Sequence, residues 1–368
     1  MEEKILNTER FSSNYNLKQP LNLIQPLTTL NTEHSTRNNT MQYPGLIDLQ
    51  INGHRGVHFS APDLTLEKIR QATRELAAAG TVAYCPTVVT SPLENYRHNL
   101  PLFAQAMRDP EIGPHILGLH LEGPFISSLE GARGAHPPEH IRQPDFQLFQ
   151  QFLEWSGNNI AILTVAPETK GAADLIRQVS AAGVTVSMGH HLADDDALAA
   201  AVQAGARACT HLGNGLPNTI NRHQNPLWWL LACDDVWGMC ITDGHHLPED
   251  FIRVALRAKT LRRFIVVSDA TDLAGQPPGA YDFQGHQVVL EPNGRIGFAG
   301  TPYLAGSSAT MLQCMNHLAS LQALSEPELW QVGFANPLQL IGRDPQALAA
   351  KLTDSRVRFR GGRFEILR

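Results

Sequence analysis

The sequence predicts an α/β protein built as a (β/α)8 barrel, with a small, incomplete β appendage from the termini and a β-hairpin insertion. Eight short apolar runs follow one another along the chain, and each ends in polar or glycine residues. Segments with helical spacing of apolar residues lie between them, which is the alternation typical of this barrel. A chain of 368 residues with 43% hydrophobic residues can bury such a core. A doubly wound open sheet is the alternative that the same alternation allows.

The N-terminal segment, residues 1–42, is rich in Asn, Thr, Ser and Gln and shows no clear apolar period. Such a composition predicts a poorly ordered or loosely docked arm. We therefore expect the barrel to occupy residues 43–350. Its eight strands are predicted within 45–53, 81–89, 115–123, 160–168, 184–191, 206–214, 236–244 and 264–271.

Helical segments connect these runs. In the first of them, Leu66, Ile69 and Leu76 recur at helical spacing before Gly80. The segment "GAADLIRQVSAAG" ends in the same way at Gly183, since glycine commonly terminates a helix.

Two further segments depart from the alternation. Residues 275–305 carry Pro-Pro-Gly and Pro-Asn-Gly turn signals between alternating residues, which predicts a β-hairpin insertion after the eighth strand. Residues 351–368 alternate around Gly-Gly and are predicted to form a C-terminal β appendage.

Composition limits the class of partner. The net charge is −6 and the sequence pI is about 6.2, which argues against a nucleic acid or an anionic membrane and favours a small molecule. No apolar stretch approaches 18 residues. The cysteines form no C-x-x-C pair and predict buried thiols in a reducing cytoplasm. They are Cys85, Cys209, Cys233, Cys240 and Cys314.

Polar residues with metal-binding or acid–base chemistry end five of the predicted strands. In such barrels the active site lies at the C-terminal ends of the strands, so these side chains should meet at one mouth. One carboxylate and two imidazoles form a three-ligand set that leaves a fourth position for water, as in catalytic zinc sites. The strand ends are Glu122, His190 with His191, His211 with Asn214, Asp243 with His245 and His246, and Ser268 with Asp269.

Taken singly, a histidine or carboxylate at a strand end is more often a structural residue than a ligand. Several such residues at corresponding strand ends favour a metal site over coincidence. Side chains alternate in direction along a strand, so we expect His191 and His245 to point elsewhere. His54, His58 and His223 are interpreted as loop residues, and Cys209 as a packing residue.

Several motifs, in chain order, resemble those of one known family. They are "PGLIDLQINGHRGVHF", "HLEGPF", "GAHPPEH", "TVAPE", "GHH", "THLGNGLPNTINR", "ITDGHH", "VSDAT" and "LAGSSATM". Together they resemble the N-acetylglucosamine-6-phosphate deacetylase family of the amidohydrolase superfamily, over about residues 44–342.

The resemblance implies a role for each matching position. Glu122, His190 and His211 would hold one divalent metal ion, which zinc, iron, manganese or cobalt could supply. Asp269 would be the general base and acid, and His136 would polarise the acetamide carbonyl. The sugar phosphate would be bound by Asn214, Gly215, Arg222 and His246, with Arg222 able to come from a neighbouring subunit of a homodimer.

Two segments depart from the superfamily and family patterns. Many amidohydrolases have His-x-His after the first strand, whereas Gln50 and Asn52 stand here and are poorer zinc ligands, so we expect one tightly held metal. After His211 the chain reads "GNGLPNTINRHQNPLWW", without the family's Arg-Glu-Pro-Gly turn. These differences fall at the expected sugar and phosphate pocket.

The resemblance implies metal-dependent hydrolysis of the acetamide of an N-acetylated amino sugar phosphate, with N-acetylglucosamine 6-phosphate as the expected substrate. Two alternatives stay open at the level of sequence. Another amidohydrolase, acting on N-acyl amino acids or cyclic amides, could use Arg222 to bind a carboxylate instead of a phosphate. A barrel that binds sugar phosphates without catalysis is the other, although the set of Glu122, His190, His211 and Asp269 argues against it.

Overall fold

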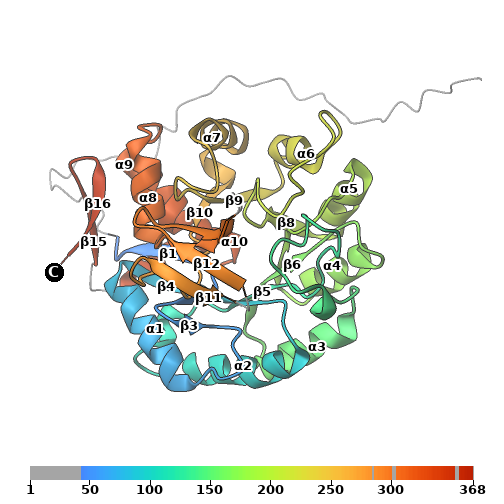
Figure 1. The fold of residues 1–368 in the computed structure, drawn as a ribbon, viewed down its shortest axis with the longest axis horizontal. Coiled ribbons are helices and arrows are strands. Elements are labelled where there is room, and N and C mark those ends of the chain that lie inside the picture. Colours follow the sequence, from blue (N-terminus) through green and yellow to red (C-terminus); the bar gives the residue numbers. More distant parts are fainter. Residues whose placement is uncertain (1–42, 284–285, 301–303, 353–355, 368) are drawn as a thin grey trace, which may run out of the picture. The chain divides into compact units, whose positions relative to one another are not determined.

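The structure, a computed structural model, describes residues 43–283, 286–300, 304–352 and 356–367 (Figure 1). The predicted N-terminal arm lies outside the described residues. Among the described residues, no helix is long and apolar enough to cross a membrane.

Eight parallel strands form the central sheet in chain order, as the sequence predicts, and each lies within one of the eight apolar runs. The seam between the last strand and the first is joined by backbone hydrogen bonds. Asp269 N donates to Gln50 O at 2.9 Å, and Asn52 N donates to Ala270 O at 2.8 Å. The prediction of a closed barrel is therefore confirmed, and the alternative of a doubly wound open sheet is wrong. The strands are β1 (Leu46–Ile51), β4 (Thr81–Val89), β5 (Leu119–Glu122), β6 (Ile160–Val165), β7 (Thr185–Met188), β8 (Ala206–Cys209), β9 (Trp237–Ile241) and β10 (Phe264–Val267).

Amphipathic helices surround these strands (Figure 1). The first predicted helix begins where Thr65 accepts a hydrogen bond from Lys68 N, and it buries Ile69 and Leu76. The helices between strands are α1 (Leu66–Ala78), α2 (Leu93–Ala106), α3 (Phe146–Trp155), α4 (Ala172–Ala181), α5 (Asp195–Ala204), α6 (Pro226–Ala232) and α7 (Glu249–Arg263). After the insertion follow α8 (Met311–Ser320), α9 (Glu326–Trp330), α10 (Asn336–Leu340) and α11 (Pro345–Lys351).

The insertion after β10 is larger than the predicted single hairpin. It forms a four-stranded antiparallel sheet of β11 (Gly279–Phe283), β12 (His286–Leu290), β13 (Arg295–Phe298) and β14 (Leu304–Ser307). The predicted Pro-Asn-Gly turn joins β12 to β13. The sheet has its own small core, which includes Phe283, Val288 and Ile296. Because a two-stranded hairpin buries too little apolar surface to be stable alone, the extra strands supply the missing partner.

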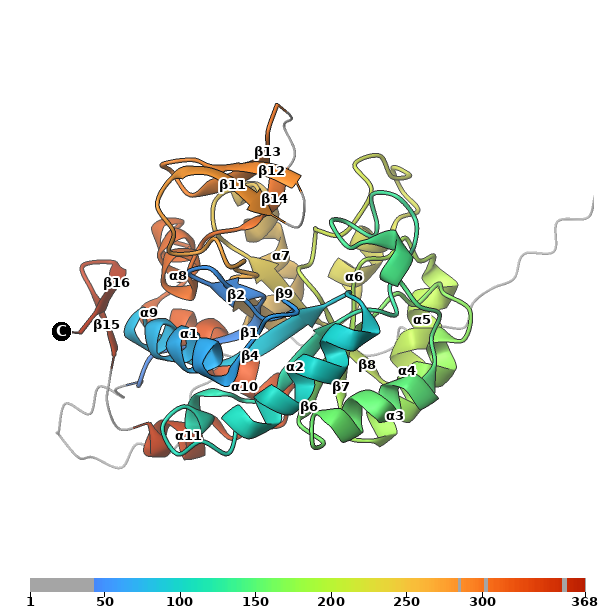
Figure 2. The same cartoon turned by 60° about the horizontal axis from the view of Figure 1, so that its bottom comes forward.

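The sheet of β11–β14 is attached to the barrel at the C-terminal end of β10. Thr271 N donates to Ser307 O at 2.8 Å, so β14 continues the hydrogen bonding just beyond the last barrel strand. Figure 2 shows this sheet, in orange, above the barrel strands. Two short pairs complete the fold: β2 (Gly53–His54) with β3 (Val57–His58), and the C-terminal β15 (Val357–Arg360) with β16 (Arg363–Ile366).

Candidate functional site

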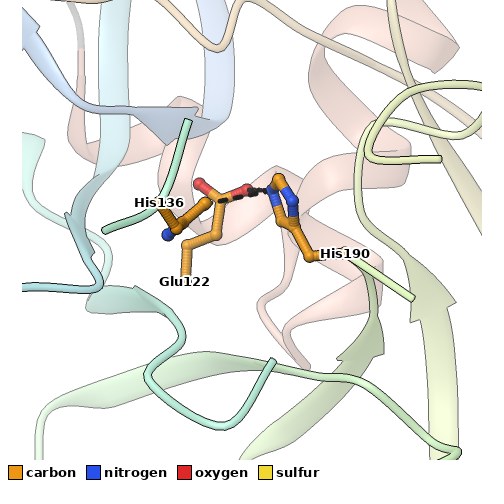
Figure 3. A group of neighbouring side chains, drawn as sticks. All are labelled: Glu122, His136 and His190. Atoms are coloured by element: carbon orange, nitrogen blue, oxygen red, sulfur yellow. Dashed lines mark hydrogen bonds and ion pairs between the residues drawn. The ribbon is translucent and has the colours of Figure 1, made fainter. Parts of the chain in front are cut away.

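Glu122 is the centre of a buried cluster of side chains at the C-terminal mouth of the barrel. It ends β5 and is 2% exposed. Its Oε1 lies 3.1 Å from His190 Nε2 and 3.0 Å from His211 Nε2, and the two Nε2 atoms are 2.9 Å apart. The structure thus brings together the three side chains that the sequence assigned to a metal. Figure 3 shows Glu122 and His190 turned toward each other, with His136 beside them.

The two imidazoles and Asp269 reach the mouth through the same local turn. His190, His211 and Asp269 each lie two residues beyond the last residue of β7, β8 and β10, respectively. Their φ angles are 52°, 31° and 50°, in the left-handed region that side chains other than glycine rarely adopt. Backbone strain of this kind is concentrated at functional sites, where surrounding structure holds it in place.

The hydrogen bond at His190 Nδ1 indicates what the cluster is suited to bind. His190 Nδ1 lies 3.0 Å from Ala132 O, and because a carbonyl can only accept, Nδ1 carries the hydrogen. With Nδ1 as the donor to Ala132, Nε2 is the ring nitrogen that faces the Glu122 carboxylate and His211. Electron-rich atoms at such distances repel one another unless a proton or a cation lies between them. An imidazole that is held by a backbone carbonyl and faces a carboxylate belongs to a donor set that fits a divalent metal ion.

His136 is a fourth potential ligand in the same cluster. The ligand atoms of Glu122, His136 and His190 all lie within 4.8 Å of one another, so this buried group could hold a metal ion. His136 Nε2 is 3.2 Å from His190 Nε2. Burial, and then the neighbouring His190, lower the pKa of His136 to about 3, so its imidazole is neutral at pH 7.

Asp269 is oriented by two side-chain amides that the sequence analysis considered only as poor metal ligands. Gln50 Nε2 donates to Asp269 Oδ1 at 3.0 Å and to Glu122 Oε1 at 3.0 Å, so one amide bridges both carboxylates. Asn52 Nδ2 donates to Asp269 Oδ1 at 2.7 Å. Burial, and then the charge of Glu122, raise the pKa of Asp269 to about 7. A cation bound beside it would lower that pKa.

The cluster opens into a cavity of about 600 Å³, within the size range of small-molecule sites. Asn214, Gly215 and His246, to which the family resemblance gives a role in substrate binding, line it, and so does His245, which was expected to point elsewhere. Gly215 has a φ of +65°, and a Cβ there would lie 2.8 Å from His211 Cε1. A side chain at this position would therefore push His211 out of place. Arg222, by contrast, is exposed and does not line the cavity of its own chain.

His246 is held by a hydrogen bond to Asp243, which the sequence placed at the same strand end. Its Nδ1 lies 2.7 Å from Asp243 Oδ2. Burial alone would raise the pKa of Asp243, but the hydrogen bond and charge of His246 prevail and lower it to about 2. The carboxylate therefore stays ionised and fixes the tautomer in which His246 Nδ1 carries a proton.

The remaining histidines and cysteines singled out from the sequence lie outside the cluster of Glu122, His190 and His211. His191 is buried, and Ala193 N donates to its Nδ1 at 3.3 Å. All five cysteines are free thiols, and Cys209 is buried in the apolar core. His58 lines the cavity, whereas His54 is buried outside its lining.

A closed parallel barrel with a buried carboxylate–imidazole cluster at its C-terminal mouth is an arrangement suited to a metal-dependent hydrolase. Comparison with models of known protein families finds no match. The chain is, however, 37% identical over 311 residues to an N-acetylglucosamine-6-phosphate deacetylase of Bos taurus, covering 81% of this chain and 74% of that protein. This chain belongs to the N-acetylglucosamine-6-phosphate deacetylase family.

A solved structure agrees with this, whereas one further relative is named for a different amino sugar phosphate. The fold matches a solved variant of N-acetyl-D-glucosamine-6-phosphate deacetylase from Mycobacterium smegmatis, in complex with N-acetyl-D-glucosamine-6-phosphate, with a TM-score of 0.74 and 29% identity. That match covers 82% of this chain and 78% of the other. An N-acetylgalactosamine-6-phosphate deacetylase of Escherichia coli O157:H7 is 27% identical, over 93% of this chain and 89% of that protein.

Proposed function

We propose that this protein hydrolyses the acetamide of N-acetylglucosamine 6-phosphate, giving glucosamine 6-phosphate and acetate. The observation that carries this proposal is the close contact of Glu122, His190 and His211, with Asp269 joined to Glu122 through the amide of Gln50. Membership of the deacetylase family gives the class of reaction, and the name of the bovine relative gives the substrate.

Glu122, His190 and His211 would hold one divalent ion, for which zinc is the first candidate, and iron, manganese and cobalt are others. When bound, such an ion polarises a carbonyl and lowers the pKa of water. His211 is a better third ligand than His136, because its Nε2 contacts both Glu122 and His190, whereas the Nε2 of His136 contacts His190 alone. Gln50 would keep the carboxylate of Glu122 aimed at the imidazoles.

Asp269 would move the proton. Both amides donate to Oδ1, so Oδ2 is available to take a proton from attacking water and then deliver it to the departing nitrogen. An amine leaves poorly unless it is protonated, so the second transfer is as important as the first. The hydrogen bonds from Gln50 and Asn52 hold the carboxylate in one orientation during both transfers.

His136 would act on the carbonyl oxygen of the acetamide. Its low pKa keeps the ring neutral, so it can donate one hydrogen bond without carrying a charge of its own. Its position beside His190 places that donor at the cluster.

The sugar would be bound by Asn214, Gly215 and His246, which line the cavity. Arg222 is exposed on its own chain, which is compatible with a contribution to the cavity of a second subunit in a homodimer. We therefore include a homodimer in the proposal, with an amino sugar phosphate as its small-molecule partner.

Release of acetate tests the proposal. Purified, metal-loaded protein should release acetate from N-acetylglucosamine 6-phosphate faster than from N-acetylgalactosamine 6-phosphate, unphosphorylated N-acetylglucosamine or N-acyl amino acids. Preferential turnover of an N-acyl amino acid would assign the protein to another amidohydrolase activity. Binding of the sugar phosphate without acetate release, by protein that holds its metal, would support a non-catalytic barrel.

A further inference from the structure

A chain of hydrogen-bonded side chains lies inside the barrel, deeper than the proposed metal ligands. It consists of one imidazole and three hydroxyls, each at most 1% exposed, and we call it the interior chain: His120, Thr164, Thr210 and Ser187. His120 Nε2 lies 2.8 Å from Thr164 Oγ1, and Thr164 Oγ1 lies 2.7 Å from Thr210 Oγ1. Ser187 Oγ lies 2.7 Å from the same Thr210 oxygen. At the other end, His120 Nδ1 lies 3.0 Å from the backbone carbonyl oxygen of Leu49.

The interior chain crosses the inside of the barrel. In the order of the sheet, β4 separates β5 from β1, yet His120 of β5 reaches the carbonyl of Leu49 in β1. Likewise β7 separates β6 from β8, yet Thr164 of β6 contacts Thr210, the residue that follows β8. Side chains of strands that are not neighbours meet in this way on the inner face of a closed barrel. None of the four side chains lines the substrate cavity.

Two members of the interior chain lie next to proposed metal ligands in the sequence. His120 is two residues before Glu122, so the two side chains point to the same face of β5. Thr210 directly precedes His211. The interior chain therefore joins the strand that carries Glu122 to the strand end that carries His211.

His211 depends on its backbone more than His190 does. The ring of His190 is held by Ala132 O, 3.0 Å from its Nδ1. Within the described residues, by contrast, no hydrogen-bond partner is found for His211 Nδ1. Its position is set by a turn with a φ of 31° and by Thr210, whose backbone N donates to Met188 O at 2.8 Å. Groups that orient a metal ligand from behind influence the affinity for the metal, so Thr210 is well placed to do this for His211.

Gly189 makes room for the interior chain. A Cβ there would lie 2.8 Å from both Thr164 Cγ2 and Thr210 Cβ, so any other residue would push the two threonines apart. This glycine directly precedes His190. A buried network whose hydroxyls all have partners is rigid, because breaking one bond leaves an unpaired polar group in the core.

We propose that the interior chain is a positioning network that fixes the spacing between Glu122 and His211, and thereby sets the affinity of the cluster for a divalent metal ion. This inference rests on the proposed metal site and extends it to residues deeper in the barrel. Thr210 is the central member, because its hydroxyl is shared by Thr164 and Ser187. Without that hydroxyl, His211 should no longer be held 3.0 Å from the Glu122 carboxylate.

Thr210→Val tests the inference by metal binding. Valine has nearly the same shape as threonine but can form neither hydrogen bond. We expect the dissociation constant of zinc, measured by competition with a chromophoric chelator, to rise roughly 10- to 100-fold, the range for lost outer-shell partners of metal ligands. Thr210→Ser keeps the hydroxyl and should restore binding close to the parental affinity. At saturating zinc, KM for N-acetylglucosamine 6-phosphate should change little, because the interior chain lies outside the cavity lining.

Thr73→Val is the matched control for the loss of a buried hydroxyl. Thr73 is 1% exposed in α1, and its Oγ1 lies 2.9 Å from the hydroxyl oxygen of Tyr84, outside the cavity lining. Both valine variants should lower the midpoint of denaturant unfolding, but only Thr210→Val should weaken zinc binding. If both variants lost stability and both bound zinc as tightly as the parent, the interior chain would be purely structural and the inference would be overturned. Failure of Thr210→Ser to restore zinc binding would also overturn it.

Ser187→Ala decides the question if Thr210→Val does not fold. It removes only the last hydroxyl and one hydrogen bond of the interior chain, so the dissociation constant of zinc should rise less, roughly 2- to 10-fold. Parental affinity in this variant would refute the inference. A parent that binds zinc but releases no acetate would refute the proposed reaction, whereas the order of zinc affinities would still test the interior chain. A parent that binds no zinc, iron, manganese or cobalt would overturn both the metal site and this inference.

Discussion

Replacing Asp269 with asparagine tests the proposed proton transfer, and the structure indicates that the fold should tolerate it. Oδ1 of Asp269 accepts hydrogen bonds from Gln50 Nε2 at 3.0 Å and from Asn52 Nδ2 at 2.7 Å. The Oδ1 of asparagine can accept both. The change also removes a buried negative charge near Glu122, so we expect the free energy of unfolding to stay the same or to rise slightly.

The effect on turnover should be large because asparagine cannot hold the proton. General acid and base catalysis contributes roughly 10²- to 10⁴-fold to rate, so kcat should fall by that factor. This corresponds to about 3–5 kcal/mol in the activation barrier. The metal content should be unchanged, because the side-chain hydrogen bonds described for Asp269 join it to Gln50 and Asn52, whereas His190 contacts Glu122.

The pH dependence of kcat/KM is a second test of the role of Asp269. Burial and the neighbouring Glu122 raise the pKa of Asp269 to about 7, and a bound cation would bring it down. The base must be ionised to accept a proton, so kcat/KM of the parent should fall as the pH falls through that pKa. The asparagine variant should lack this acidic limb.

Three measurements on one preparation decide the matter: acetate release across pH, metal content by elemental analysis and thermal unfolding. A folded, metal-loaded Asp269→Asn protein that retained most of its turnover would remove Asp269 from the mechanism. An acidic limb that persisted unchanged in the variant would assign that limb to another group.

The remaining predictions concern the metal, the core and the phosphate. Elemental analysis should find one metal ion per chain of the parent protein. The His211→Asn variant should lose this ion, whereas the His136→Gln variant should keep it but turn over slowly. The reverse pattern would exchange the roles of the two histidines. Asp48 is buried and its pKa is raised from 3.8 to about 7, so the folded state binds the extra proton and its stability should fall as the pH rises from 4 to 7. The Asp48→Asn variant should lack that fall, so in denaturant unfolding the effect of the pH change on the free energy of unfolding should differ between the two proteins by on the order of 4 kcal/mol at pH 7. Parallel curves of stability against pH for the two proteins would contradict this. If the parent is dimeric by light scattering, Arg222→Ala should raise KM for the phosphorylated substrate. An unchanged KM would exclude Arg222 from substrate binding.

The barrel and its cluster were predictable because local signals and the fold agree. Each apolar run contains a strand, and the C-terminal ends of parallel strands meet at one mouth whatever the details of packing. The positions could therefore bring Glu122 and the strand-end imidazoles to one mouth, and the family resemblance singled out His190 and His211 among them. The contact distances of 2.9–3.1 Å are what the structure adds.

The role of Gln50 and the position of Arg295 in the lining of the cavity could not be predicted in the same way. Gln50 was considered only as a poor metal ligand, because its bridge between two carboxylates depends on barrel closure between residues 219 positions apart. Arg295 follows a turn signal and resembles any exposed hairpin residue in sequence. Only the docking of the inserted sheet, through Ser307 and Asn293, places it at the cavity.

Closure of the barrel at its seam and orientation of the proposed base are the same event. Gln50 and Asn52 lie at the end of the first strand, and Asp269 lies at the end of the last, so the bonds that close the barrel also orient the proposed base. A folding intermediate with seven strands paired could already contain Glu122 and both imidazoles. It would bind metal yet remain inactive, so during refolding metal uptake should precede the return of acetate release.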